Sequence, residues 1–241
     1  MKTKILAIFA CLLWGSAFAG AKIGFEYTTP LHLSGMRFML AGLLLIPFLI
    51  YQKIDWISNL KEWRYMLLFG FLQTFIQYGF FFMGLNKVPA AISAIIIGGG
   101  PFFVAVMAHF TMGNDRMSFR KILAIVLGMA GIVFISFAKG GSIHTDISFY
   151  YGVILLIISN IVGASTNIIV AKNRNKVSPV MLTAFANFSG GLILYIVSFF
   201  TEDWYVKPYS LEFYIAWIWL ALIPAVVFYI WYSLLKRPEV K

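Results

Sequence analysis

Long runs of apolar residues restrict the fold of this chain more than any other feature. A helix rises 1.5 Å per residue, so about 20 apolar residues cross a hydrocarbon core that is about 30 Å thick. Short connections predict that consecutive helices are antiparallel neighbours, and hence an all-α, polytopic transmembrane protein. The eight predicted spans are Ile5–Ala21, Leu31–Ile50, Tyr65–Leu85, Ala90–Met112, Ile122–Ala138, Phe149–Ala171, Val180–Phe200 and Phe213–Leu235.

The composition excludes the main soluble classes. The chain is 61% hydrophobic and 12% charged, whereas soluble domains are about 25% charged. This balance excludes a soluble enzyme and a disordered chain, and the single cysteine, Cys11, excludes an internal disulfide framework. A net charge of +10 would suggest nucleic acid in a soluble protein. Here the basic residues lie in short loops, so we expect a lipid bilayer and no nucleic acid as partner.

The distribution of these basic residues predicts the orientation, because Lys and Arg concentrate in cytoplasmic loops. Fourteen fall on one side of the predicted spans and four on the other, which places both termini in the cytoplasm. The predicted cytoplasmic residues are Lys2, Lys4, Lys53, Lys61, Arg64, Arg116, Arg120, Lys121, Lys172, Arg174, Lys176, Lys236, Arg237 and Lys241. The four on the other side are Lys22, Lys87, Lys139 and Lys207.

An internal repeat appears when the chain is shifted by 149 residues. The shifted unit contains five spans, an odd number, so its two copies must enter the membrane in opposite senses, as in many secondary transporters. We therefore expect two inverted five-helix repeats, residues 1–140 and 148–241, the second incomplete, with eight spans of an expected ten. The matching residues are Ser16 with Ser165, Gly42-Leu43 with Gly191-Leu192, Lys87 with Lys236, and Pro89 with Pro238.

Several motifs, in order along the chain, resemble the EamA group of the drug/metabolite transporter superfamily. Leu13-Trp14-Gly15-Ser16-Ala17-Phe18 is similar to that family's opening helix, and Gly35-Met36-Arg37-Phe38 to its second. Leu85-Asn86-Lys87-Val88-Pro89 resembles the link between the third and fourth helices, and Gly128-Met129-Ala130-Gly131 the fifth. One departure is Gly113-Asn114-Asp115-Arg116, where the family usually has Gly-Glu-Arg.

The resemblance implies an integral, multi-pass protein of the bacterial inner membrane, without enzyme activity or cofactor. It implies ten helices in two inverted repeats and secondary transport of small metabolites, amino-acid-like or other organic solutes, by alternating access. It does not fix the substrate, the direction of transport, the coupling ion or the oligomeric state.

Two other function classes stay open at this point. A membrane-embedded enzyme would need clustered acidic, histidine or cysteine residues in its spans. All nine acidic residues lie outside the predicted spans, and His32, His109 and His144 show no ligand spacing. We therefore predict no catalytic residue and no metal site. A channel or receptor-like protein without a transport cycle would be indicated by a continuous pore or a large soluble domain.

Arg37 is the single Lys or Arg residue inside a predicted span. A charge there costs a few kcal/mol, so it faces a cavity, pairs with a partner or reaches the interface. One interpretation is a site for a carboxylate or another anion, and the alternative is snorkelling to the nearby outer interface.

Polar residues inside the other spans form stripes at helical spacing. Amides in hydrocarbon need partners, so these faces should point inward, toward a central cavity or toward interhelical hydrogen bonds. The candidate cavity residues, beside Arg37, are Trp14, Gln73, Gln77, Tyr78, Asn160, Asn167 and Asn187.

The fourth span contains Gly98, Gly99, Gly100 and Pro101 near its middle. Glycine allows close backbone approach and proline removes an N–H group, so we predict a kink here. It serves either as a hinge for alternating access or as a site of close helix packing.

Overall fold

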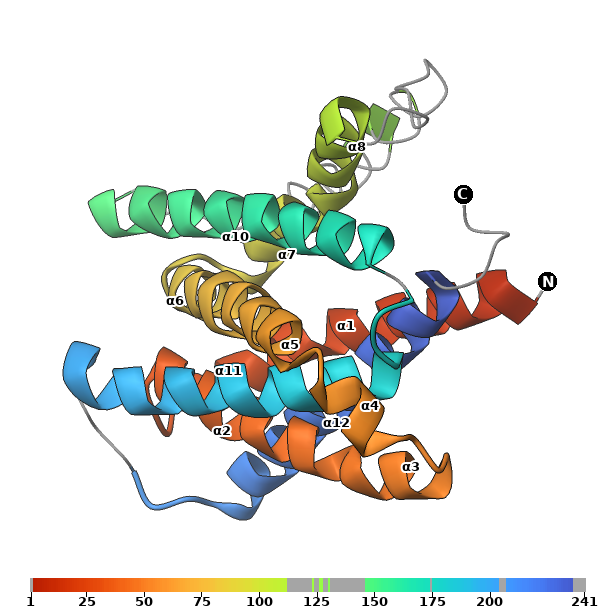
Figure 1. Ribbon diagram of the computed structural model, residues 1–241. Coiled ribbons are helices and arrows are strands. Elements are labelled where there is room, and N and C mark those ends of the chain that lie inside the picture. Colours follow the sequence, from red (N-terminus) through yellow and green to blue (C-terminus); the bar gives the residue numbers. More distant parts are fainter. Residues whose placement is uncertain are drawn as a thin grey trace. The chain divides into compact units, whose positions relative to one another are not determined.

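The computed structural model describes residues 2–111, 146–173, 175–203 and 207–235, with single positions at 123, 126, 127 and 130. Over these residues the regular structure is helical and contains no strand, which confirms the predicted all-α class (Figure 1). The helices are α1 Lys2–Phe25, α2 Pro30–Leu44, α3 Ile46–Tyr51, α4 Trp56–Leu60, α5 Trp63–Gly70, η1 Phe71–Gln77, α6 Tyr78–Lys87, α7 Ala90–Gly98, α8 Gly100–Thr111, α10 Ile147–Lys172, α11 Pro179–Thr201 and α12 Leu211–Leu235.

The predicted spans coincide with these helices except for Ile122–Ala138, of which the structure describes only positions 123, 126, 127 and 130. Among the described residues, five helical stretches are long and apolar enough to cross a membrane, and α12 adds a shorter apolar segment, Leu211–Val227. The count of eight spans therefore stays a prediction. The five stretches are Pro30–Tyr51, Trp63–Lys87, Ala90–Thr111, Ile147–Lys172 and Pro179–Thr201.

Prolines mark where several helices begin. Pro30 and Pro179 occupy the first turns of α2 and α11, where the missing N–H would have no helical partner in any case. Pro47 separates α3 from α2 within one apolar stretch, because it lacks the N–H that would continue the preceding helix. The apolar run Leu31–Ile50 predicts one continuous helix, so the break between α2 and α3 differs from that prediction.

The third predicted span contains a π-helix, η1, between α5 and α6. A π-helix bonds each N–H to the carbonyl five residues earlier, is rare, and occurs frequently at functional sites. It carries two of the candidate cavity residues, Gln73 and Gln77. Nothing in the apolar pattern predicted this change of helical pitch.

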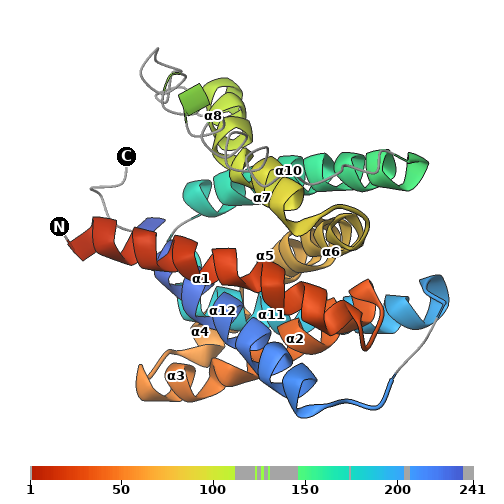
Figure 2. The same ribbon diagram turned by 180° about the vertical axis from the view of Figure 1, so that it is seen from behind.

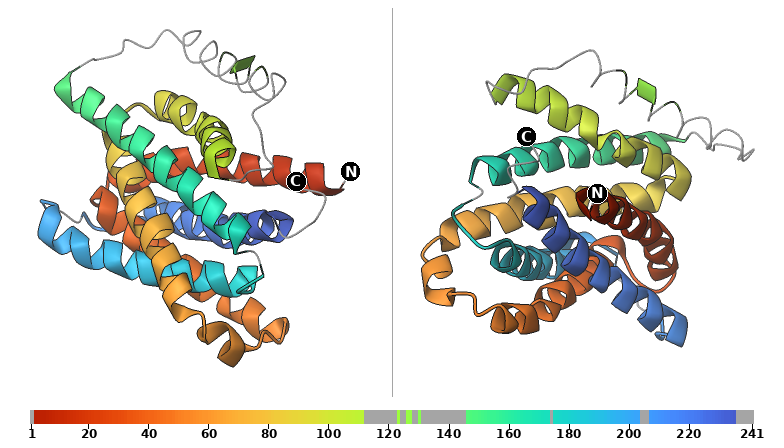
Figure 3. Two further views of the ribbon diagram at one scale, coloured as in Figure 1. Left: turned by 45° about the horizontal axis from the view of Figure 1, so that its top comes forward. Right: turned by 90° about the vertical axis from the view of Figure 1, so that its right-hand side faces the viewer.

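The chain divides into two compact units. Unit 1 consists of Met1–Gly79 and Val170–Lys241, and unit 2 of Phe80–Ile169. In unit 1, α2 packs along α11 and α1 packs along α12 (Figure 2), while α11 also contacts α5 and η1. In unit 2, α7 and α8 lie beside α10 (Figure 3), and the Ser165 hydroxyl lies 3.7 Å from the Met107 sulfur.

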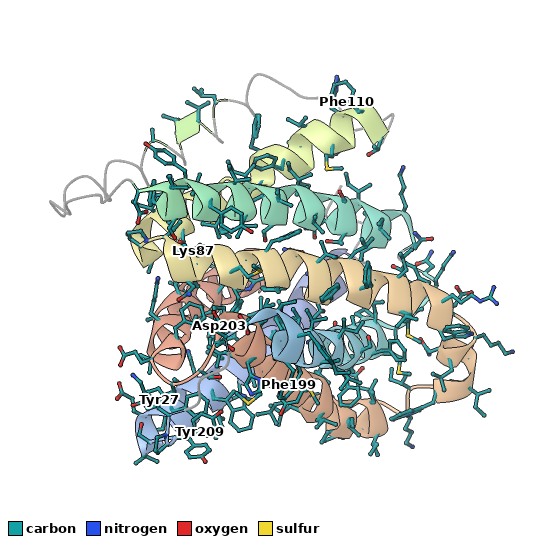
Figure 4. The ribbon with its side chains drawn as sticks, turned by 90° about the vertical axis from the view of Figure 1, so that its left-hand side faces the viewer. Tyr27, Lys87, Phe110, Phe199, Asp203 and Tyr209 are labelled. Carbon is teal, nitrogen blue, oxygen red and sulfur yellow. The ribbon has the colours of Figure 1, made fainter. Side chains whose placement is uncertain are left out.

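Large apolar side chains cover much of the surface of both units. Leu12 is 69% exposed and Phe200 83% in unit 1, and Phe110 is 81% exposed in unit 2 (Figure 4). Soluble monomers rarely expose contiguous apolar surface on this scale, because water disfavours it. Lipid tails accommodate such a surface, so the exposure agrees with a protein that lies in a bilayer.

Candidate functional site

Arg37 lies in unit 1, seven positions into α2, which is about 10 Å from the start of the helix at 1.5 Å per residue. Its side chain is only 1% exposed and is the largest fully buried side chain among the described residues. Burial of a guanidinium is expensive unless surrounding groups stabilise its charge.

Aromatic rings surround this guanidinium. The Arg37 Cζ atom lies 4.4 Å from the centre of the Phe38 ring and 5.7 Å from the centre of the Tyr78 ring. The two rings lie 4.6 Å apart, and the Tyr78 hydroxyl accepts a side-chain hydrogen bond from Trp14. Residues of α1, α2 and α6 therefore meet here, and cation–π attraction contributes to holding the charge. The structure thus brings Trp14, Arg37 and Tyr78 together.

Buried amides and hydroxyls occur on the neighbouring elements of unit 1. Asn187 on α11 is 1% exposed, Gln73 in η1 is 6% exposed, and Thr74 is fully buried. η1 and α11 are in direct contact, because a Cβ atom placed on Gly190 would touch Thr74.

Some of the buried polar atoms in unit 1 make no hydrogen bond within the described residues. Within the described residues, the buried atoms that lack a hydrogen-bond partner include Ser34 Oγ, Thr74 Oγ1, Gln77 Oε1 and Asn187 Nδ2. An unsatisfied buried polar group costs about 1–3 kcal/mol, so a native structure retains one where water or a ligand completes it.

Asn160 and Asn167 lie on α10, and their side-chain amides donate hydrogen bonds to main-chain carbonyls of unit 2. Asn160 Nδ2 donates to the Ile96 carbonyl of α7 at 2.6 Å, and Asn167 Nδ2 donates to the Gly163 carbonyl at 2.9 Å. The first bond joins two helices of unit 2 and the second stays within one helix. The Asn160 bond matches the interhelical alternative for this stripe, whereas the place of Asn160 and Asn167 in a cavity stays a prediction.

The Gly98–Pro101 segment interrupts the fourth predicted span. α7 ends at Gly98, α8 begins at Gly100, and the Gly99 N–H still reaches the Ile95 and Ile96 carbonyls at 3.1 Å. A Cβ atom on Gly100 would lie 3.3 Å from Asn160 Oδ1, so small size permits close packing here. The helix break is present, and the hinge role stays a prediction.

Glu202, which follows α11 directly, is not among the residues predicted for the site. Its carboxylate accepts the N–H of Leu31 at 2.9 Å and the N–H of His32 at 3.2 Å, so it caps the first turn of α2. The His32 ring lies 3.2 Å from the Ser198 hydroxyl of α11. About 170 residues separate these partners in sequence, and only the folded packing of α2 on α11 reveals the contact.

Further contacts join the loops at this end of unit 1. The Ser210 hydroxyl donates to the Tyr27 hydroxyl at 2.8 Å, and the Lys207 N–H donates to the Tyr27 carbonyl at 3.1 Å. Burial raises the pKa of Tyr209, while a hydrogen bond with Thr28 acts in the opposite direction. The Tyr209 phenol is therefore neutral near neutral pH.

The described residues contain no group of three or more His, Cys, Asp and Glu side chains that could hold a metal ion. The groups gathered in unit 1 are a guanidinium, aromatic rings, amides and hydroxyls. Such groups recognise a polar organic solute through charge and hydrogen bonds.

Comparison with known proteins now identifies the family. Residues 1–137 match the model of the EamA-like transporter family. The chain belongs to this family. The match confirms the resemblance that the motifs indicated, and together with the apolar helices it makes the chain a multi-pass membrane protein of a transporter family.

Several EamA relatives align over most of the chain. The uncharacterized transporter YvbV of Bacillus subtilis is 26% identical over 88% of this chain and 68% of its own. The uncharacterized inner membrane transporter YedA of Escherichia coli is 26% identical over 92% of this chain and 70% of its own. A probable amino-acid metabolite efflux pump of Escherichia coli is 29% identical over 55% of this chain and 42% of its own.

A crystal structure of another protein shares the fold of this EamA chain. It superposes with a TM-score of 0.81 at 18% sequence identity, over 98% of this chain and 79% of that one. At this identity the likeness shows the arrangement of helices alone.

Proposed function

We propose that this EamA protein is a secondary transporter of small organic solutes that carry a carboxylate, and that Arg37 binds the carboxylate. The observation that carries the proposal is the fully buried guanidinium of Arg37, held over Phe38 and Tyr78 inside a membrane protein. A guanidinium is planar and offers paired N–H donors, so it binds a carboxylate through two parallel hydrogen bonds. Its burial favours this role over snorkelling, which would expose the charge at the interface.

Amide groups on the neighbouring elements of unit 1 suit the rest of an amino-acid-like solute. Gln77 Oε1 is an acceptor for an ammonium group, and Asn187 Nδ2 is a donor for a carboxylate or carbonyl oxygen. Trp14 and Gln73 complete the proposed cavity residues of unit 1. The name of the probable amino-acid metabolite efflux pump supports the same class of solute.

We further propose that the solute crosses by alternating access between two inverted repeats. Support comes from two glycines 149 positions apart, on α2 and α11. A Cβ atom on Gly42 would lie 2.8 Å from both the Ala184 carbonyl oxygen and the Phe188 nitrogen. A Cβ atom on Gly191 would lie 3.1 Å from the Gly35 carbonyl oxygen and 2.7 Å from the Met39 nitrogen.

Shifting the residue numbers by 149 converts the contacts of Gly42 into those of Gly191, and the reverse. Subtracting 149 converts Ala184 into Gly35 and Phe188 into Met39, and adding 149 converts Gly42 into Gly191. A two-fold relation between the repeats produces such reciprocal contacts, because each helix then meets the other in the same way. In this arrangement both termini are cytoplasmic, and the break at Gly99 is a candidate hinge.

Flux measurements in proteoliposomes test the proposal. A panel of radiolabelled amino acids, their amides and neutral sugars is offered to the purified protein. We expect saturable flux of solutes with a carboxylate, stimulated by the same solute on the opposite side. Non-saturable flux without this exchange would indicate a channel, and flux of neutral sugars alone would overturn the proposed class.

Variants of Arg37 test the proposed contact. Arg37→Gln should abolish carboxylate flux, and Arg37→Lys should lower it by about tenfold or more, since it keeps the charge and loses the paired donors. Arg64→Gln is a matched control, because Arg64 is also stacked on an aromatic ring, 5.5 Å from the Trp63 ring centre, but is exposed. Undiminished flux in Arg37→Gln would overturn the contact.

A further inference from the structure

We infer that the crossing of α2 and α11 is the fixed axis of the transport cycle, about which the rest of the protein moves. The inference rests on the proposed alternating access between inverted repeats. It adds that the contact between α2 and α11 stays closed throughout the transport cycle. The crossing is defined here as residues 35–42 of α2 with residues 184–195 of α11.

Backbone touches backbone along this crossing. A Cβ atom on Gly35 would lie 2.6 Å from the Tyr195 nitrogen, and Gly42 and Gly191 show equally close approaches to main-chain atoms. Such an interface has few side chains that could repack into a second arrangement, whereas conformational switching needs two discrete packings. In lipid, close van der Waals packing is also the main force that holds helices together, so separation would lose it.

Symmetry gives a second, independent reason. In a transporter with inverted repeats, the outward-open and inward-open states arise when the two repeats exchange conformations. A contact that the exchange converts into itself is therefore the same in both states. The reciprocal contacts of Gly42 and Gly191 form such a set. Met39 and Phe188 are each other's equivalents, because their numbers differ by 149.

The ends of the two helices are not equivalent in this sense. Glu202 caps α2 with two hydrogen bonds, and under the shift of 149 the counterpart of Glu202 is Lys53. A lysine side chain has no acceptor for the N–H groups at the start of a helix, so it cannot cap α11 as Glu202 caps α2. At the start of α11, the N–H of Ser178 donates to Asn59 Oδ1 at 2.7 Å. Contacts at the ends therefore differ between the repeats and can change during the cycle, whereas the crossing cannot.

A covalent link across the crossing tests the inference. In a Cys11→Ser background, cysteines replace Met39, which is partly exposed, and Phe188, which is 38% exposed. A short bifunctional thiol reagent should link them, as a gel shift after proteolysis between the two helices would show. Flux of the transported solute should then stay within about twofold of the unlinked protein, while the single variants Met39→Cys and Phe188→Cys control for modification alone.

Loss of flux on linking, with flux retained in both modified single variants, would overturn the inference, and so would failure of the link to form. A distance measurement that needs no transported solute distinguishes a moving crossing from a failure of the proposed transport function. Spin labels at positions 39 and 188 should give one narrow distance distribution in bilayers with and without solute. Two resolved distances would overturn the fixed axis even if no transported solute were found.

Discussion

At the scale of single residues, the contact of Glu202 with the start of α2 is a charge-assisted cap. Both bonds come from main-chain N–H groups that no helical carbonyl can satisfy, and the carboxylate also faces the positive end of the helix dipole. Glu202→Gln keeps the size but directs an amide N–H toward one of these donors. We expect a loss of about 1–3 kcal/mol in unfolding free energy.

The matched control for this variant is Asp203→Asn, the neighbouring acidic residue, which is exposed. It removes the same charge without the cap, so its thermal unfolding in detergent should match that of the wild type. An equal drop in both variants would mean that the general charge at this end of unit 1, and not the cap, stabilises the fold.

At the scale of helices, glycine decides how closely α11 can approach the junction of α5 and η1. A Cβ atom on Gly190 would lie 2.5 Å from the Gly70 carbonyl oxygen, a main-chain atom that cannot move aside cheaply. Gly190→Ala should therefore lower the yield of folded protein on size-exclusion chromatography and reduce the melting temperature. Overpacking costs about 1–3 kcal/mol, and more where backbone must shift.

Gly15→Ala provides the opposite case on α1. A Cβ atom there would meet nothing within 4 Å among the described residues. Alanine also has a higher helix propensity than glycine by about 1 kcal/mol. This variant should melt at or above the wild-type temperature. A destabilised Gly15→Ala together with a tolerated Gly190→Ala would contradict the packing described here.

These elements also show what the sequence could predict. Apolar runs located the long described helices to within a few residues, because the length of a span follows from the thickness of the bilayer, whereas the short helix α4 lies in no predicted span. The π-helix η1 and the Glu202 cap escaped prediction, since both depend on contacts between segments that are distant in sequence. For the site, Arg37 and Tyr78 were predicted as separate residues, whereas the role of Phe38 as the ring beneath the guanidinium required the folded helix.

At the scale of the whole molecule, the inverted repeat and the excess of basic residues in alternate loops make one joint prediction about sidedness. Glu26 and Asn175 occupy the same register in the two repeats, being 149 positions apart, and both are exposed. Inverted copies must place them on opposite faces of the membrane, with Glu26 outside because the loops rich in Lys and Arg stay in the cytoplasm.

Cysteine labelling in whole cells separates the two parts of this prediction. In the Cys11→Ser background, Glu26→Cys should react with a membrane-impermeant maleimide at once, and Asn175→Cys only after the membrane is permeabilised. Labelling of both positions from one face would contradict the inverted repeat, and with it the two-fold origin of the Gly42 and Gly191 contacts. Labelling with the two faces exchanged would keep the repeat and overturn the orientation, because the repeat fixes only that the copies are opposed, whereas the basic loops decide which copy begins inside.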